Sequence, residues 1–260
     1  MSNNRGKFVW YDLNTPDPAA AIEFYTQVVG WKTEPFGKEG DYQMLVGARG
    51  PIGGVMTLAD EAKAMGAPPH WLAYVEVPDI QASAAQVKAL GGTVYAGPFP
   101  IPDVGQFAVI GDPQGALIAL FTPKESSPPP EGPPRVGEYA WAELITSDVE
   151  GALAFYGPLF GWVKTGEMPM PPMGTYTFFG QKPEEMLGGM MVRPPEMPVS
   201  AWGYYVTVAD LDASVAKAQE LGGRLIFGPS PVPGGGRMAM MMDPQGAAFN
   251  LVTESTATAS

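Results

Sequence analysis

The amino-acid sequence predicts an α+β fold built as a tandem duplication, in which each copy is a pair of βαβββ modules. The first observation behind this prediction is that the motifs of residues 8–121 recur at one fixed offset in residues 139–252. The second is composition, because 33 Gly and 29 Pro among 260 residues favour many short strands joined by tight turns. The chain therefore has the length and the pattern of two domains.

The two copies are separated by 131 positions, the spacing between Trp10 and Trp141. The turn sequence Asp112-Pro113-Gln114-Gly115 recurs at this spacing as Asp243-Pro244-Gln245-Gly246. So many matches at one spacing indicate a duplication. The same offset relates Tyr25 to Tyr156, Gly30-Trp31 to Gly161-Trp162, Trp71 to Trp202, and Asp79 to Asp210.

We predict one domain over residues 1–122 and a second over residues 138–254. Residues 123–137 between them are rich in proline, which lacks an amide donor and favours extended chain, so this segment is expected to be a semi-rigid linker. The tail at 255–260 contains only Ser, Thr and Ala and is predicted to be disordered.

The first module begins with a predicted strand at Phe8–Asn14. Asp17 is a suitable N-cap and Pro18 suits a first helical position, so a helix is predicted over Ala19–Val29 and expected to end at Gly30. Gly/Pro turns then separate three further predicted strands, at Trp31–Phe36, Tyr42–Ala48 and Gly53–Leu58.

The second module repeats this plan, and the third and fourth follow it in the second copy. Trp71 opens its first strand as Trp10 does in the first module, and Asp79 is the expected helix cap. The predicted elements are a strand at Trp71–Val77, a helix at Ile80–Leu90 closed by Gly91-Gly92, and strands at Thr93–Ala96, Gln106–Ile110 and Leu117–Phe121.

Charge and composition exclude several classes of protein. The formal net charge of -12 repels a phosphate backbone, so we expect no nucleic-acid partner. No apolar run is long enough to span a membrane, and the N-terminus lacks the apolar stretch of a secretory signal, so we expect a cytoplasmic protein without a membrane partner. The chain has no cysteine, which rules out disulfides and cysteine nucleophiles, and His70 is its single histidine, which rules out a histidine pair.

These paired modules resemble the vicinal oxygen chelate superfamily of glyoxalase I, bleomycin resistance proteins and extradiol dioxygenases. Within it they look like the tandem glyoxalase-like or hydroxylase-like branch, and the resemblance covers residues 8–121 and 139–252. It implies that the sheet of each domain curves into an open cup. The motifs that carry it are Trp-Xaa-Xaa-Leu in the first strand, Phe24-Tyr25 and Phe155-Tyr156, Gly30-Trp31 and Gly161-Trp162, the Gly-Gly pairs before the fourth strand, and the two Asp-Pro-Gln-Gly turns.

The resemblance also implies where a divalent metal would be held, because relatives use His, Gln or Glu on the first strand of each module and Glu on the last strand. Alanine, leucine, glycine and tryptophan cannot bind a metal there, and a lone amide oxygen is a weak ligand. We therefore predict no cofactor, although family resemblance leaves a divalent metal open and His70 is a weak candidate ligand. The corresponding positions are Trp10, Trp141, Leu72, Gly203, Ala119 and Asn250.

Alternation along the strands identifies the side chains expected to line the cups. An acid inside a sheet must be paired, hydrogen-bonded or shifted in pKa, so the three acids in this set are candidate catalytic groups or ligand-binding anions. Each acid could instead bond to backbone or to a tyrosine hydroxyl and serve only the fold, and the tryptophans could serve only packing. The predicted lining residues are Trp10, Asp12, Tyr74 and Glu76 in the first cup, and Trp141, Glu143, Tyr205, Thr207 and Asn250 in the second.

The glycine-rich segment Gly234-Gly235-Gly236-Arg237 is not assigned as a phosphate loop, because it lacks the Gly-Lys-Ser/Thr ending. Arg237 either reaches the mouth of the second cup or is a solvated charge at the start of a strand.

The leading hypothesis is a small-molecule-binding protein without the family metal site, taking an apolar or cationic ligand in one or both cups. The alternative is a glyoxalase-like lyase or a dioxygenase- or hydroxylase-like enzyme, using a carboxylate alone or an unusual ligand set such as Asp12, Glu76 and His70. A third hypothesis has one domain bind while the other is scaffold. The two domains are expected to pack as an intramolecular pseudo-dimer, with further homo-oligomers left open.

Overall fold

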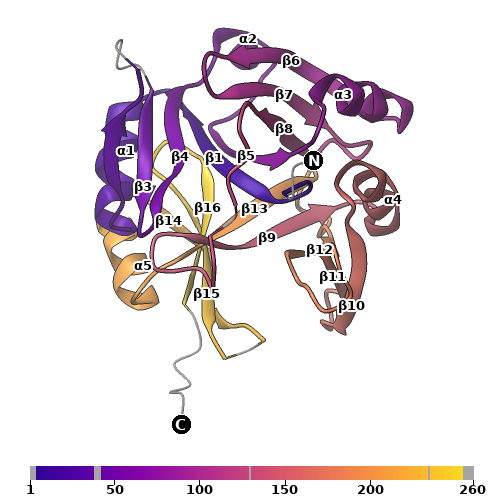
Figure 1. Cartoon of the computed structure of the whole chain (residues 1–260). Helices are drawn as coiled ribbons and strands as arrows, with labels where there is room; N and C mark the ends of the chain where they lie inside the picture. Colours follow the sequence, from indigo (N-terminus) through magenta and orange to yellow (C-terminus); the bar gives the residue numbers. More distant parts are fainter. Residues whose placement is uncertain (1–3, 38–41, 129, 234, 254–260) are drawn as a thin grey trace. The chain divides into compact units, whose positions relative to one another are not determined.

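The structure of the chain is a computed structural model that describes residues 4–37, 42–128, 130–233 and 235–253 (Figure 1). The predicted disordered tail at 255–260 lies outside the described residues.

Each repeat contributes eight strands, as the duplication predicts. The first repeat contains β1 (Phe8–Thr15), α1 (Pro18–Val28), β2 (Lys32–Pro35), β3 (Gln43–Gly47), β4 (Gly50–Thr57), α2 (Asp60–Ala64), β5 (His70–Glu76), α3 (Ile80–Ala89), β6 (Thr93–Ile101), β7 (Gly105–Gly111) and β8 (Leu117–Pro123). The second contains β9 (Tyr139–Thr146), α4 (Val149–Phe160), β10 (Val163–Pro169), β11 (Thr175–Gly180), β12 (Gly188–Val192), β13 (Ala201–Thr207), α5 (Leu211–Glu220), β14 (Arg224–Pro231), β15 (Arg237–Met242) and β16 (Ala248–Thr253).

The strands form two eight-stranded mixed sheets with the same order. That order is β2-β3-β4-β1-β5-β8-β7-β6 in the first sheet and β10-β11-β12-β9-β13-β16-β15-β14 in the second. In each module the first strand pairs in parallel with the fourth. The second strand pairs antiparallel with the third, and the third pairs antiparallel with the fourth. The predicted α+β fold of paired βαβββ modules is confirmed.

Two details differ from the sequence prediction. The strand expected to stop at Ala96 continues as β6 to Ile101. Its pairing with β7 has a register shift between Ala96 and Phe99, which lets the ladder continue past the Gly-Pro sequence that normally marks a turn. The short helix α2 was not predicted, since five residues are too few for a periodic apolar pattern.

The helix caps are those that the sequence predicts. The carboxylate of Asp17 accepts a hydrogen bond from the backbone N–H of Ala20, and Asp79 accepts from the first turn of α3 in the same way. Asp148 and Asp210 cap the corresponding helices of the second repeat. Each cap satisfies an amide that the helix leaves unpaired and fixes where the chain turns from strand to helix.

The chain divides into two compact units, and neither coincides with a repeat. Unit 1 combines the second module of the first repeat with the first module of the second, and in it α3 packs against α4 (Figure 1). Unit 2 combines the first and last modules, and in it α1 packs against α5. Unit 1 consists of Met1–Trp10, Ala73–Pro130 and Trp141–Gly203, and unit 2 of Tyr11–Leu72, Glu131–Ala140 and Tyr204–Ser260. The domain boundaries expected from the repeat stay a prediction.

A buried Trp–Tyr–Asp link joins the two modules of unit 2. The Tyr25 hydroxyl, on α1, donates to Asp243 Oδ2 at 3.0 Å and accepts from Trp71 Nε1 at 3.1 Å. Asp243 starts the Asp-Pro-Gln-Gly turn, and its other oxygen accepts from the backbone N–H of Gln245 and Ala247. Burial and the neighbouring carboxylate raise the pKa of Tyr25 well above its ordinary value, so the hydroxyl keeps its proton and donates.

Unit 1 contains an equivalent buried Trp–Tyr–Asp link. Tyr156, on α4, donates to Asp112 Oδ2 at 3.0 Å and accepts from Trp202 Nε1 at 3.0 Å. Burial raises the pKa of Asp112 above its ordinary value, although the turn amides and the Tyr156 hydroxyl stabilise the charged form. In both units the turn of one repeat is thus fixed to a helix of the other repeat.

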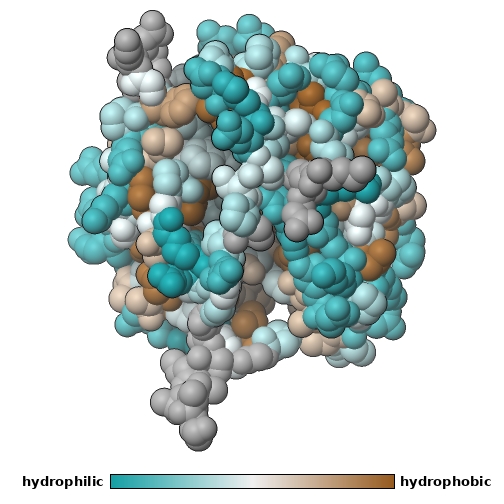
Figure 2. Space-filling view, viewed as in Figure 1, coloured by the Kyte–Doolittle hydropathy of each residue, from teal (hydrophilic) through white to brown (hydrophobic). Residues whose placement is uncertain are grey.

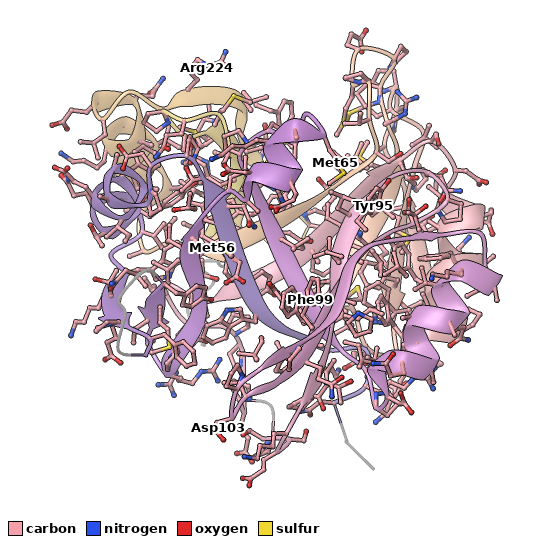
Figure 3. All side chains as sticks on the ribbon, turned by 90° about the horizontal axis from the view of Figure 1, so that it is seen from above. Met56, Met65, Tyr95, Phe99, Asp103 and Arg224 are labelled. Atoms are coloured by element: carbon pink, nitrogen blue, oxygen red, sulfur yellow. The ribbon has the colours of Figure 1, made fainter. Side chains whose placement is uncertain are left out.

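Polar side chains dominate the face shown in Figure 2, where hydrophobic residues form small separate patches. Two of the exposed apolar residues, Tyr95 and Phe99, lie on the edge strand β6 (Figure 3). The charged residue Asp103 lies at the tip of the β6–β7 hairpin. No helix of the described residues is long and apolar enough to cross a membrane.

The link in unit 1 gives a test of stability. Tyr156→Phe leaves the Asp112 carboxylate and the Trp202 N–H without their buried partner, so the free energy of unfolding in urea should fall by about 1–3 kcal/mol. Tyr95→Phe removes the hydroxyl of an exposed tyrosine and should change it by less than about 0.5 kcal/mol. Equal effects of the two substitutions would contradict the assignment.

Candidate functional site

Glu143 is a buried carboxylate in the central strand β9 of the second sheet, with 8% of its surface exposed. The Tyr176 hydroxyl, on β11, donates to Glu143 Oε1 at 2.8 Å, and Trp141 Nε1 donates to the same hydroxyl at 2.9 Å. The Phe178 ring lies edge-on to Trp141, with ring centroids 6.1 Å apart. We call these four residues the Glu143 cluster, and all of them belong to unit 1.

Glycine at position 189 makes the Tyr176–Glu143 contact sterically feasible. Gly189 pairs with Glu143 in the register of β12 and β9. A Cβ atom built on Gly189 would lie 2.0 Å from the Tyr176 ring, so the ring fits only because that strand has no side chain there. Gly189, the second glycine of a Gly-Gly pair, therefore provides the space that the Tyr176 ring occupies.

The first repeat contains the same arrangement around Asp12. Asp12 is 4% exposed, and the Tyr42 hydroxyl donates to its Oδ1 at 2.5 Å. Gly54 pairs with Asp12 in register, and a Cβ there would lie 2.1 Å from the Tyr42 ring. We call Asp12 and Tyr42 the Asp12 pair, which lies in unit 2.

Tyr74 and Glu76 are both buried at alternate positions of β5, as the sequence predicts for one face of a strand. Glu76 Oε1 accepts a hydrogen bond from the Ser126 hydroxyl at 2.9 Å. Ser126 lies in the predicted linker, and the side-chain amide of Asn4 donates to the backbone carbonyl of Ser127. The linker start and the chain start therefore both pack near this acid.

Three further residues predicted to line the cups lie outside the Glu143 cluster and the Asp12 pair. Tyr205 and Asn250 are neighbours in the register of β13 and β16, and both are buried. Trp10 is half-buried on β1 and belongs to unit 1, with Tyr74 and Glu76. The structure thus brings Trp141 together with Glu143, and Tyr205 with Asn250, while the assembly of all these residues into two cups stays a prediction.

Sequence reasoning missed Tyr42 and Tyr176, the partners of the two acids. The fixed offset does not match them, because the segments that lead into β3 and β11 differ between the repeats. The glycines opposite the acids were the available signal, since a strand position without a side chain leaves room for a large neighbour.

The side chains at the family's metal positions do not fit a divalent ion. Leu72 and Ala119 are buried and apolar, and Asn250 offers one amide oxygen. Glu143 is already bound by a tyrosine hydroxyl. The described residues contain no group of three His, Cys, Asp or Glu side chains that could hold a metal ion.

His70 is the first residue of β5, which therefore begins early enough to place His70 and Leu72 at alternate positions. Its Nδ1 lies 2.8 Å from the backbone carbonyl oxygen of Pro68, so this nitrogen carries the proton in the neutral ring. Burial lowers the pKa of His70 from its ordinary value. A local contact to the preceding loop accounts for the orientation of this ring.

Comparison with known proteins establishes the family. The model of the Glyoxalase/Bleomycin resistance protein/Dioxygenase superfamily matches residues 7–120 and again residues 138–251, so the chain belongs to this superfamily and contains two tandem domains of it.

Two curated relatives match this chain over most of its length and most of their own. CFP32 of Mycobacterium tuberculosis, which is named for a proposed glyoxylase activity, is 32% identical over 94% of this chain and 93% of its own. The anthracycline biosynthesis protein DnrV of Streptomyces peucetius is 28% identical over 95% of this chain and 93% of its own. The Mn(II)-bound glyoxalase of Novosphingobium aromaticivorans shares the fold, with a TM-score of 0.65 and 15% identity over 98% of this chain and 83% of its own.

His70 offers a direct pH test, because it is the sole histidine of the sequence. Its imidazole proton signals in an NMR titration should give a pKa below 6.5, since burial disfavours the charged ring. Because the pKa of His70 is lower in the folded chain than in the unfolded chain, the unfolded chain takes up a proton at a higher pH. The folded state therefore loses stability as the pH falls below the ordinary histidine pKa. The unfolding free energy should therefore drop between about pH 7 and 5 more in the wild type than in His70→Gln. A pKa above 6.5 would contradict the placement.

The space at Gly189 gives a second test at this site. Gly189→Ala forces the Tyr176 ring away from Glu143 and should lower the free energy of unfolding by about 1–3 kcal/mol, with a change in Trp141 fluorescence. Gly166→Ala is the matched control, because a Cβ there lies at ordinary contact distance, 3.5 Å, from the Phe178 ring. If Gly189→Ala behaved like the control, the tyrosine would not lie on this strand.

Proposed function

We propose that this chain is a small-molecule-binding protein of the glyoxalase fold that takes an apolar or cationic aromatic ligand without using the family's metal site. The observation that carries the proposal is the Glu143 cluster. Trp141 and Phe178 are partly exposed, whereas the Tyr176 and Glu143 side chains beneath them are buried and bonded to each other.

The exposed part of the cluster is aromatic. The planes of Trp141 and Phe178 lie at 79° to each other, so a flat ligand stacked on one ring meets the edge of the other. Aromatic pairs of this kind contribute about 0.5–1.5 kcal/mol beyond the area they bury. This arrangement favours a planar apolar group over a flexible polar one.

The buried part of the cluster is a carboxylate held by a neutral phenol. Burial and the adjacent Glu143 raise the pKa of Tyr176, so its hydroxyl stays protonated and donates to the carboxylate. A carboxylate beside the aromatic rings would add to the attraction of a cation for their faces. The net charge of -12 attracts cations over a longer range.

The Asp12 pair repeats the acid–tyrosine half of this arrangement in unit 2, which supports a second binding position in the first repeat. A duplicated chain with two such positions is consistent with the intramolecular pseudo-dimer expected from the sequence. Binding by one domain alone, with the other as scaffold, predicts one ligand per chain instead of two.

A second candidate function is a glyoxalase-like lyase or a dioxygenase-like enzyme, and membership of the superfamily favours it. CFP32 is named for a proposed glyoxylase activity, and the structural relative from Novosphingobium is a glyoxalase. In such an enzyme Asp12, Glu76 or Glu143 would act as the base. The two candidates are separated by whether a substrate is consumed.

The binding proposal is tested by titrating the protein with N-methylquinolinium, a planar aromatic cation, and with quinoline, its neutral analogue, and following tryptophan fluorescence. Trp141→Ala should weaken binding of both probes at least about tenfold, or ~1.4 kcal/mol. Glu143→Gln keeps a hydrogen-bond acceptor but removes the charge, so it should weaken the cation more than the neutral probe.

Phe99→Ala is the control, because Phe99 is an exposed aromatic residue outside the Glu143 cluster. Absence of binding by the wild type, or equal binding by Trp141→Ala, would overturn the proposal. Turnover of methylglyoxal hemithioacetal that is lost in Glu143→Gln would favour the enzyme instead.

A further inference from the structure

A pocket of about 780 Å³ lies in unit 2 and includes Thr207, one of the residues predicted to line the second cup. One wall is residues 131–136 of the predicted linker, and another is the end of β13 with the start of α5. Arg237, at the start of β15, and Thr253, at the end of β16, complete the lining. The pocket therefore brings together three parts of the second repeat and the linker that precedes it.

The linker wall is fixed by Arg49. Its guanidinium donates to the Glu138 carboxylate, with Nε 2.8 Å from Oε1, and to the backbone carbonyl of Glu131. The hydrogen bond from Arg49 lowers the pKa of Glu138, so this ion pair persists at neutral pH. The wall is thus held in place before any ligand arrives, which reduces the entropy lost on binding.

Thr207, the last residue of β13, lines the pocket and is 3% exposed. Its backbone N–H donates to Glu138 and its carbonyl accepts from Gly137, but its hydroxyl has no hydrogen-bond partner among the described residues. A buried hydroxyl without a partner is unfavourable, so native structures seldom retain one. A polar group of a ligand in the pocket would remove this cost.

The first repeat fills the equivalent position with its own chain. Glu76 corresponds to Thr207 by the repeat offset, and Ser126, which follows β8, donates to its carboxylate. In unit 2 the shorter, neutral Thr207 replaces the acid. The two repeats therefore differ at this position: the first has a hydrogen bond within the chain, and the second has a pocket.

The lining carries charges of both signs. Arg237 Nη1 pairs with Asp212 Oδ2 at 2.7 Å, and Asp210 caps α5. Arg135 and Glu131 are exposed on the linker wall. A net anion would meet the carboxylates and a net cation the guanidinium groups, whereas a zwitterion can satisfy both.

The lining also contains apolar side chains that suit a hydrocarbon group. Pro133, Val136, Val208 and Leu211 lie between the charged residues. Proline offers no amide donor, so this surface favours contact with carbon over further hydrogen bonds. The combination matches an α-amino acid with an apolar side chain.

We propose that this pocket binds a small zwitterion of the apolar α-amino-acid class, with the Thr207 hydroxyl bonded to its polar end and Arg237 and the acids of the lining facing its two charges. The site shares no residue with the Glu143 cluster, so it stands or falls independently of the proposed function.

The test is isothermal titration calorimetry of the full chain with three probes of one shape. L-leucine carries both charges, L-leucinamide lacks the carboxylate and 4-methylpentanoate lacks the ammonium group. L-leucine should bind at least about tenfold more tightly than either comparator, because each comparator leaves one set of charged groups without its counterpart. Equal binding of a comparator, or no binding of L-leucine, would overturn the proposal.

Two substitutions assign the binding to this pocket. Thr207→Val replaces the hydroxyl by a methyl group of the same shape, so it should weaken L-leucine binding about tenfold while leaving the protein equally or more stable in urea. Thr207→Ser restores a hydroxyl and should recover most of the affinity. Arg237→Gln, at an exposed position, should also weaken binding. Unchanged affinity in both Thr207→Val and Arg237→Gln would place the ligand elsewhere.

Discussion

The hydrogen bond from a tyrosine hydroxyl to a buried carboxylate is the interaction on which this structure depends. Tyr25 and Tyr156 fix the aspartates of the two Asp-Pro-Gln-Gly turns, and Tyr42 and Tyr176 fix the acids within the sheets. Burying a carboxylate is costly unless its oxygens are bonded, and a neutral phenol supplies that bond without introducing a second charge. One chemical solution therefore serves both the packing of the modules and the candidate binding surface.

The links at the turns explain why the compact units do not follow the repeats. Each Asp-Pro-Gln-Gly turn belongs to one repeat, while the tyrosine that binds its aspartate lies on a helix of the other repeat. The helices of the joined modules also pack on each other, α1 on α5 and α3 on α4. Each unit therefore contains one module from each repeat, and a substitution in one repeat is expected to affect the module of the other repeat in the same unit.

The sequence predicts the fold well because its signals are local and repeated: capping residues such as Asp17 and Asp79, glycines at turns, and tryptophans at one spacing. Of the candidate site, it identifies acids such as Glu143 by strand alternation from the inward-facing position that the family resemblance gives to Trp141. It does not identify Tyr176, because which side chain crosses from a neighbouring strand depends on register and on an absent side chain at Gly189. Nor does it identify the pocket at Thr207, since that depends on how the linker folds back.

The acid–tyrosine pairs also give the account its central claim, that Asp12 and Glu143 are bonded to tyrosine hydroxyls and not to a divalent ion. The most direct measurement is equilibrium dialysis of the full chain against Zn²⁺, Ni²⁺, Mn²⁺ and Fe²⁺, followed by quantitative metal analysis. The account predicts metal contents well below one ion per chain for all four, with no change in Glu143→Gln. A tightly held, stoichiometric ion that is lost in Glu143→Gln or in Asp12→Asn would contradict it.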